Sequence, residues 1–217
     1  MPSDLNPIST FIVNNTISNS AQGVGLSLHS CTYASIIGNS ILNNQSTTIG
    51  GGIDCRNGYP STGTVIVQNN LIKGNTTTNK GGGIRIENGG GEFSGNIIVN
   101  NVAPNGGGVS NAGNPSFLNN FIINNTATSG VGGGIDSYPG SMDLRNNIIS
   151  GNTSASSVSV CQPCQRSCNA SGLATRNSWT KSAMRILTRI TRLAIESWSS
   201  CLDTRNRMRS YPSRMNR

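Results

Sequence analysis

The chain has 217 residues, with 16 Lys and Arg against 8 Asp and Glu, a formal net charge of +8. The excess comes from the C-terminal part: residues 155–217 hold eleven basic and two acidic residues, whereas residues 1–154 hold five and six. The positive net charge therefore does not indicate that residues 1–154 bind nucleic acid, because a nucleic-acid-binding domain carries the basic residues itself. No stretch reaches the roughly 20 apolar residues of a membrane-spanning helix.

The N-terminus, Met1-Pro2-Ser3-Asp4-Leu5, lacks the charged and apolar regions of a secretory signal peptide. A first repeat already starts at Thr10-Phe11-Ile12. We therefore expect a fragment of a longer array, or a start placed too late. The alternative is a true start with a short cap.

A phrase of Asn, four residues and Asn recurs six times along the main part. It stands at Asn14–Asn19, Asn39–Asn44, Asn70–Asn75, Asn96–Asn101, Asn120–Asn125 and Asn147–Asn152. The closing Asn residues are 25, 31, 26, 24 and 27 positions apart. Such a period is typical of stacked repeats, because one repeat alone cannot bury its apolar face.

Two apolar columns follow from aligning the six phrases. Three positions before the opening Asn stand Phe11, Ile36, Val67, Phe93, Phe117 and Leu144. Two positions after it stand Thr16, Ile41, Ile72, Ile98, Ile122 and Ile149. The residue before the first column is mostly polar, and alternation of this kind predicts strands with one buried face.

A second phrase of three Gly and one apolar residue follows each central unit, at 50–53, 81–84, 106–109 and 132–135. Each period should thus hold two or three short strands separated by Gly- or Asn-rich corners. Asn suits a corner because it tolerates the left-handed conformation and because stacked Asn amides can bond to each other. The sequence predicts an all-β fold, a parallel β-helix of about six coils.

These phrases resemble those of the right-handed parallel β-helix repeat proteins of the pectate-lyase-like superfamily. They are also similar to polymorphic outer-membrane protein repeats, which pair a GGA[IVL] phrase with an FxxN phrase. Phe93-Ser94-Gly95-Asn96, Phe117-Leu118-Asn119-Asn120 and Phe11-Ile12-Val13-Asn14 fit the second phrase, whereas Gly replaces Ala in the first. The resemblance implies a right-handed coil; one fold hosts many activities, so it implies little about function.

The sequence divides into repeats at 8–153 and a non-repeat basic tail at 154–217. The tail is either a separate element, with a basic amphipathic helix at Lys181–Trp198 that caps the coil or meets a membrane surface, or a frameshifted translation. In a shifted frame Ala183–Thr188 could encode D-A-D-P-D, which is similar to a segment that follows the last coil in this family. We expect the tail not to continue the β-helix.

Few residues of the repeats suit catalysis. Lyases of this fold use clustered acidic Ca²⁺ ligands with a basic residue, yet Asp54 and Asp136 should lie three coils apart, too far to share a metal. Asp54 and Arg85 should be neighbours and could pair. Glu92 and Asp143 should lie two coils apart, at a separation of ~10 Å. This separation is compatible with the two carboxylates of an inverting glycosidase, and equally with two unrelated surface carboxylates.

The only His, His29, has no second His with which to bind a metal and is expected on the surface or in a turn. Cys55 should point inward as a buried thiol, near Cys31 of a neighbouring coil. Cys161, Cys164, Cys168 and Cys201 lack the second C-x2-C pair of a zinc knuckle. We expect no cofactor and no metal.

We expect a structural or interaction protein, part of a secreted or surface-displayed β-helix, with polysaccharide or cell-surface glycans as partners and no nucleic acid. The alternative is a polysaccharide lyase or glycoside hydrolase with active coils outside this fragment, for which Glu92 and Asp143 are the candidate catalytic residues.

Overall fold

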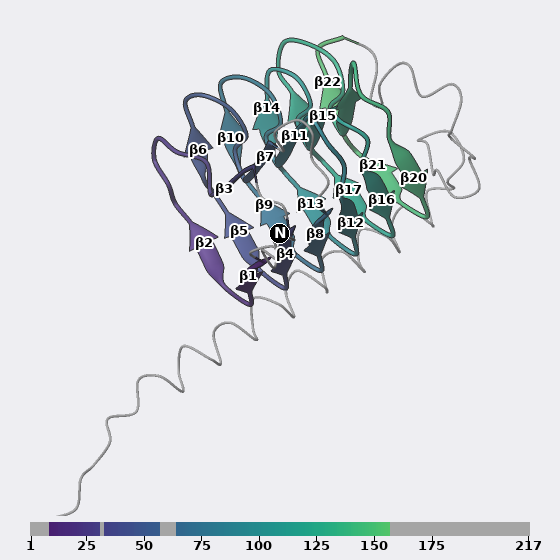
Figure 1. Ribbon diagram of the computed structural model, residues 1–217. Helices are drawn as coiled ribbons and strands as arrows, with labels where there is room; N and C mark the ends of the chain where they lie inside the picture. Colours follow the sequence, from purple (N-terminus) through teal and green to yellow (C-terminus); the bar gives the residue numbers. More distant parts are fainter. Residues whose placement is uncertain (1–8, 31–32, 57–63, 157–217) are drawn as a thin grey trace, which may run out of the picture. The chain divides into compact units, whose positions relative to one another are not determined.

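The computed structural model describes residues 9–30, 33–56 and 64–156, which form 22 β-strands (Figure 1). All strand pairs are parallel, and neighbours in a sheet come from successive turns of the chain. The predicted parallel β-helix is confirmed, with about five turns in four sheets. Among these residues there is no helix, and hence none able to cross a membrane. The predictions for Cys31, Lys181–Trp198, the tail cysteines and the reading frame fall outside the described residues.

Two of the sheets have six strands each. Sheet A contains β1 (Ser9–Val13), β4 (Tyr33–Ile37), β8 (Thr64–Gln68), β12 (Glu92–Ser94), β16 (Ser116–Leu118) and β20 (Asp143–Arg145). Sheet B contains β2 (Thr16–Ser18), β5 (Ser40–Leu42), β9 (Leu71–Lys73), β13 (Ile97–Val99), β17 (Phe121–Ile123) and β21 (Ile148–Ser150).

The other two sheets have five strands each. Sheet C contains β3 (Leu26–His29), β7 (Ile53–Arg56), β11 (Ile84–Glu87), β15 (Val109–Ala112) and β19 (Ile135–Ser137). Sheet D contains β6 (Gln45–Ser46), β10 (Thr76–Thr77), β14 (Val102–Ala103), β18 (Thr126–Ala127) and β22 (Thr153–Ser154). A full turn therefore has four strands rather than the predicted two or three. The Asn corners separate the strand of sheet A from that of sheet B and the strand of sheet B from that of sheet D, and the Gly-rich turn separates the strand of sheet D from that of sheet C.

The interior is a set of stacked columns, one or two from each sheet. The predicted column of sheet B is confirmed: its five Ile side chains lie in register and are at most 6% exposed, and they are Ile41, Ile72, Ile98, Ile122 and Ile149. In sheet A the interior column contains two stacked rings, Phe93 and Phe117, whose centroids lie 4.6 Å apart. Fully buried stacks of this kind supply the apolar burial that stabilises the coil.

The first coil lies one residue away from its predicted register. Ile12, not Phe11, pairs with Ile36, and Ile17, not Thr16, pairs with Ile41. Phe11 is 71% exposed as a result. The first phrase therefore runs from Asn15 to Ser20, whose backbone N–H groups donate to the next coil's Asn side chains. A shift of one residue moves every side chain of a strand to the other face.

Two residues build each corner and divide the two tasks that the sequence alone assigns to one Asn. The left-handed residue comes directly before each ladder Asn, or before Ser20 in the first coil. In every turn it is Asn or Gly with φ between 53° and 68°: Asn14, Gly38, Asn69, Gly95, Asn119 and Asn146 before β2 to β21, and Asn19, Asn43, Gly74, Asn100, Asn124 and Gly151 after them. These residues make the bend.

The second Asn of each corner forms the hydrogen-bonded ladder. The side-chain Oδ1 of Asn101 accepts from the backbone N–H and Nδ2 of Asn75, at 2.9 and 3.0 Å. Its Nδ2 donates to the Ile72 carbonyl and to Asn125 Oδ1, both at 3.0 Å. Asn101 is fully buried, so these bonds satisfy polar groups that water cannot reach.

Candidate functional site

The outer face of sheet C holds the densest group of charged side chains in the described part of the chain. A Gly-rich turn leads into each of its central strands, and Gly51 and Gly52 lie so close to the carbonyls of the next coil that a Cβ would collide with them. Before this turn, Ser46 Oγ accepts from the Ile49 N–H at 3.2 Å and donates to the Ile49 carbonyl at 3.1 Å. The hydrogen-bonded and closely packed turn positions the start of β7, and with it Asp54.

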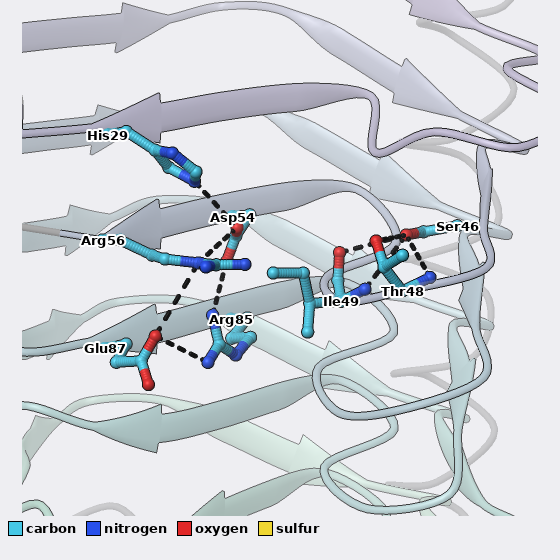
Figure 2. Close-up of polar contacts among 8 residues, drawn as sticks. All are labelled: His29, Ser46, Thr48, Ile49, Asp54, Arg56, Arg85 and Glu87. Carbon is cyan, nitrogen blue, oxygen red and sulfur yellow. Dashed lines mark hydrogen bonds and ion pairs between the residues drawn. The ribbon is translucent and has the colours of Figure 1, made fainter.

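Asp54 is the centre of the group, and Figure 2 shows three basic side chains converging on its carboxylate. Arg56 Nε lies 2.9 Å from Oδ2, Arg85 Nη1 lies 3.0 Å from Oδ1, and His29 Nε2 lies 3.3 Å from Oδ2. They come from three adjacent strands, β7, β11 and β3. The Asp54 side chain is only 2% exposed, so these partners replace the water that a buried carboxylate loses.

A second carboxylate closes the group from the solvent side. Glu87 Oε2 lies 2.7 Å from Arg85 Nη2 and 3.7 Å from Arg56 Nε. Two guanidinium groups thus face two carboxylates, and the imidazole of His29 stands at the edge. The side chains of His29, Glu87 and Arg56 keep 55%, 36% and 32% of their surface in solvent. We call these five residues the sheet C cluster.

The sequence predicts part of this cluster. The pairing of Asp54 with Arg85 is confirmed, since the two residues are direct neighbours in the ladder. His29 lies at the surface, as expected, but its contact with Asp54 is not predicted. The repeat alignment contains the information needed to predict this contact. His29, Arg56 and Glu87 occupy one outward column, two residues after the column of Asp54.

The two candidate catalytic carboxylates lie on another face, the outside of sheet A. Glu92 and Asp143 flank Ser116 in one column, two strands apart, as the repeat alignment predicts. Glu92 accepts a 3.0 Å hydrogen bond from Ser94 Oγ. Asp143 is held by Arg145, with Oδ1 at 3.0 Å from Nε and Oδ2 at 2.7 Å from Nη2. A catalytic role for either residue stays a prediction.

Asp136 ends the column that contains Asp54 and Arg85, and it is buried without a comparable set of partners. Only 7% of Asp136 is exposed, and its ladder neighbour is Ser110. Within the described ranges its carboxylate receives no hydrogen bond and no ion pair. Burial raises the pKa of the Asp136 carboxyl above its usual 3.8, and the positive charge of Lys80 partly offsets this rise.

Asp136 should therefore make stability fall as pH rises. Below pH 3.8 the folded and unfolded chains both hold the proton; at higher pH the unfolded chain releases it first, so the free energy of unfolding falls until pH exceeds the raised pKa. We expect Asp136→Asn to match the wild type well below pH 3.8 and to be more stable than the wild type at pH 7, as measured by urea unfolding. Asp143→Asn, which removes a paired surface carboxylate, is the control. Equal pH profiles for wild type and Asp136→Asn would contradict the role given to this burial.

The thiol of Cys55 points inward, as predicted, and the residue is 3% exposed. In the part of the chain that the structure describes, no three His, Cys, Asp or Glu residues gather closely enough to hold a metal ion. The sheet C cluster instead offers N–H donors and carboxylate oxygens, the groups that bind a polar ligand by hydrogen bonds.

No family model, no curated protein and no solved structure matches this chain.

Proposed function

We propose that this β-solenoid is a non-catalytic recognition module of a secreted or cell-surface protein, and that its sheet C cluster contacts glycans. The observation that carries the proposal is the fixed position of the cluster's exposed groups. The buried carboxylate of Asp54 contacts both Arg56 and Arg85, so the N–H donors of these side chains are already positioned in the absence of a partner. Pre-organised side chains lose less conformational entropy on binding.

The chemistry of the cluster suits a ligand rich in hydroxyl groups. Arg56 uses Nε for Asp54 and Glu87, and its Nη groups make no hydrogen bond to any described residue. Glu87 adds carboxylate oxygens that can accept from a hydroxyl. The resemblance of the repeats to the pectate-lyase-like superfamily and to polymorphic outer-membrane protein repeats supports an extracellular setting of this kind.

The test is a binding screen of the full chain against neutral and acidic polysaccharides, followed by calorimetry with the best ligand. Arg56→Ala should weaken binding about tenfold, because it removes an exposed donor of the cluster. Arg145→Ala, which removes an exposed Arg from sheet A, should leave the affinity unchanged. A chain that binds no glycan, or an Arg56→Ala variant that binds as well as the wild type, would refute the proposal.

Polysaccharide cleavage is a second candidate function, favoured by the placement of Glu92 and Asp143 on one face. Two strand spacings separate them by ~10 Å, close to the upper limit for an inverting pair. The bidentate contact with Arg145 holds the Asp143 carboxylate in one orientation, as a catalytic base requires. Release of reducing ends or unsaturated products by the wild type, and its loss in Glu92→Gln, would favour cleavage over recognition.

A further inference from the structure

Two Asn–Gly pairs lie in the described part of the chain, and their surroundings differ. Asn88-Gly89 stands in the turn between β11 and β12, and Asn105-Gly106 begins the Gly-rich turn that leads into β15. The third pair, Asn57-Gly58, lies outside the described residues. In an Asn–Gly pair the Asn side chain reacts readily with its own backbone, because Gly has no Cβ that would shield the following nitrogen.

The reaction is the loss of ammonia from the Asn side chain. The backbone nitrogen of the following residue loses its proton to solvent and attacks Cγ, so that an N–C bond forms and the C–N bond of the side-chain amide breaks. The leaving amide group takes up a proton from solvent, and a cyclic succinimide remains. Water then opens the ring at either carbonyl and gives aspartate or isoaspartate. A hydrogen bond donated by the backbone N–H, or one that holds the side-chain amide, opposes the attack because it fixes the reacting group in another direction.

The Asn88-Gly89 pair has neither restraint from the residues that the structure describes. Asn88 is exposed, and its side chain makes no hydrogen bond to a described residue. The Gly89 N–H likewise donates to none, although the Gly89 carbonyl accepts from the Asn114 N–H of the next coil at 2.7 Å. The φ of Asn88 is 51° and that of Gly89 is 116°, and two further Gly residues follow. Such a Gly-rich turn opens locally at low cost.

The Asn105-Gly106 pair has both restraints. The Gly106 N–H donates to the Val131 carbonyl at 3.1 Å, and the Val131 N–H donates to Asn105 Oδ1 at 3.2 Å. The Asn105 carbonyl also accepts from the Gly81 N–H at 3.1 Å, and Lys80 and Asn105 form a parallel β-bridge. Gly106 is buried and Asn105 is half-buried. These contacts between coils have to break before the Gly106 nitrogen can reach the Asn105 Cγ.

We infer that Asn88 is a site of spontaneous modification in the folded protein, where the side chain loses ammonia and becomes aspartate or isoaspartate, and that the fold protects Asn105 from the same reaction. The product places a new carboxylate directly after Glu87, which belongs to the sheet C cluster (Figure 2). The isoaspartate form also adds a carbon to the backbone of the turn between β11 and β12. The inference is independent of the function proposed for the cluster, because it depends only on the contacts of the two Asn–Gly pairs.

The experiment incubates the full chain at neutral pH in water enriched in heavy oxygen, so that only carboxyl groups formed during the incubation are labelled. Peptide mass spectrometry reads residues 88 and 105 separately from fragment ions that lie between them, and circular dichroism checks that the chain stays folded. Asn88 should convert at least about tenfold faster than Asn105, because the restrained pair reacts only from a locally opened state. Both aspartate and isoaspartate should form at residue 88, and the Asn88→Asp variant is the standard for the first product.

The same chain in urea is the control for the fold. Unfolding removes the restraints on Asn105, so both positions should then react at similar rates. Asn88→Gly, which keeps a residue suited to the left-handed conformation, should abolish labelling at residue 88 and leave the rate at Asn105 unchanged. Equal rates at the two positions in the folded chain would overturn the inference, and so would a difference that persists in urea. An Asn88 that is labelled only after unfolding would overturn it as well, because the fold would then protect both pairs.

Discussion

Asn101→Ala is expected to lower the free energy of unfolding by about 3–5 kcal/mol. The change leaves the buried Asn75 N–H and Ile72 carbonyl without the partners that they have in the ladder. Each buried polar group that loses its partner costs about 1–3 kcal/mol. For a chain of this size the melting temperature should fall by roughly 10 °C, as measured by circular dichroism.

The adjacent residue provides the control for this change. Asn100 is exposed and left-handed, with φ of 55°, so Asn100→Gly should alter the free energy of unfolding by no more than about 0.5 kcal/mol. Two neighbouring Asn residues should thus differ in cost by several kcal/mol. Similar losses at both positions would show that the ladder is not the part of the corner that stabilises the coil.

Ile98→Ala should cost about 2–5 kcal/mol, in line with other large-to-small changes in protein cores. Ile98 is fully buried in the middle of the sheet B column, with Ile72 on one side and Ile122 on the other. The coils above and below are held by their own hydrogen bonds and cannot collapse into the space. Urea unfolding measures the loss, and the slope of the transition should stay unchanged.

Ile97 is the matched control, because it is the same residue type one position earlier. It points outward and is half-buried, so Ile97→Ala should cost less than Ile98→Ala, about 1 kcal/mol or less. Equal costs for Ile97→Ala and Ile98→Ala would contradict the assignment of the two faces of β13.

The sequence predicts the fold because the same phrase returns in every turn. Five of the six aligned positions in the sheet B column are Ile, and all five are buried. The sequence leaves the register of the first coil open by one residue. Phe11 and Ile12 are both apolar, and two Asn residues, Asn14 and Asn15, stand side by side. The hydrogen bonds from the Asn15 and Ser20 N–H groups to the Asn39 and Asn44 side chains resolve the register.

The faces of the molecule were harder to predict than its interior. Asp54 and Arg85 share a column, so their contact follows from alignment. The contact of Asp54 with His29 runs diagonally between neighbouring strands, and its contact with Arg56 runs along β7, so both depend on where long side chains point. The apolar outside of sheet B cannot be predicted from alternation, because its three-residue strands β13 and β17 carry apolar side chains on both faces.

Two classes of corner residue build this solenoid: a buried Asn ladder that holds the coils together, and exposed left-handed residues that make the bends. Hydrogen exchange of the Asn side-chain amides, followed by NMR, distinguishes the two classes. The Nδ2 protons of Asn70, Asn96, Asn101 and Asn120 should be strongly protected, because each donates two hydrogen bonds in the interior. Those of Asn69, Asn100 and Asn119 should exchange as fast as in an unfolded peptide. Uniform exchange across both classes would show that the buried Asn side chains do not form a hydrogen-bonded ladder.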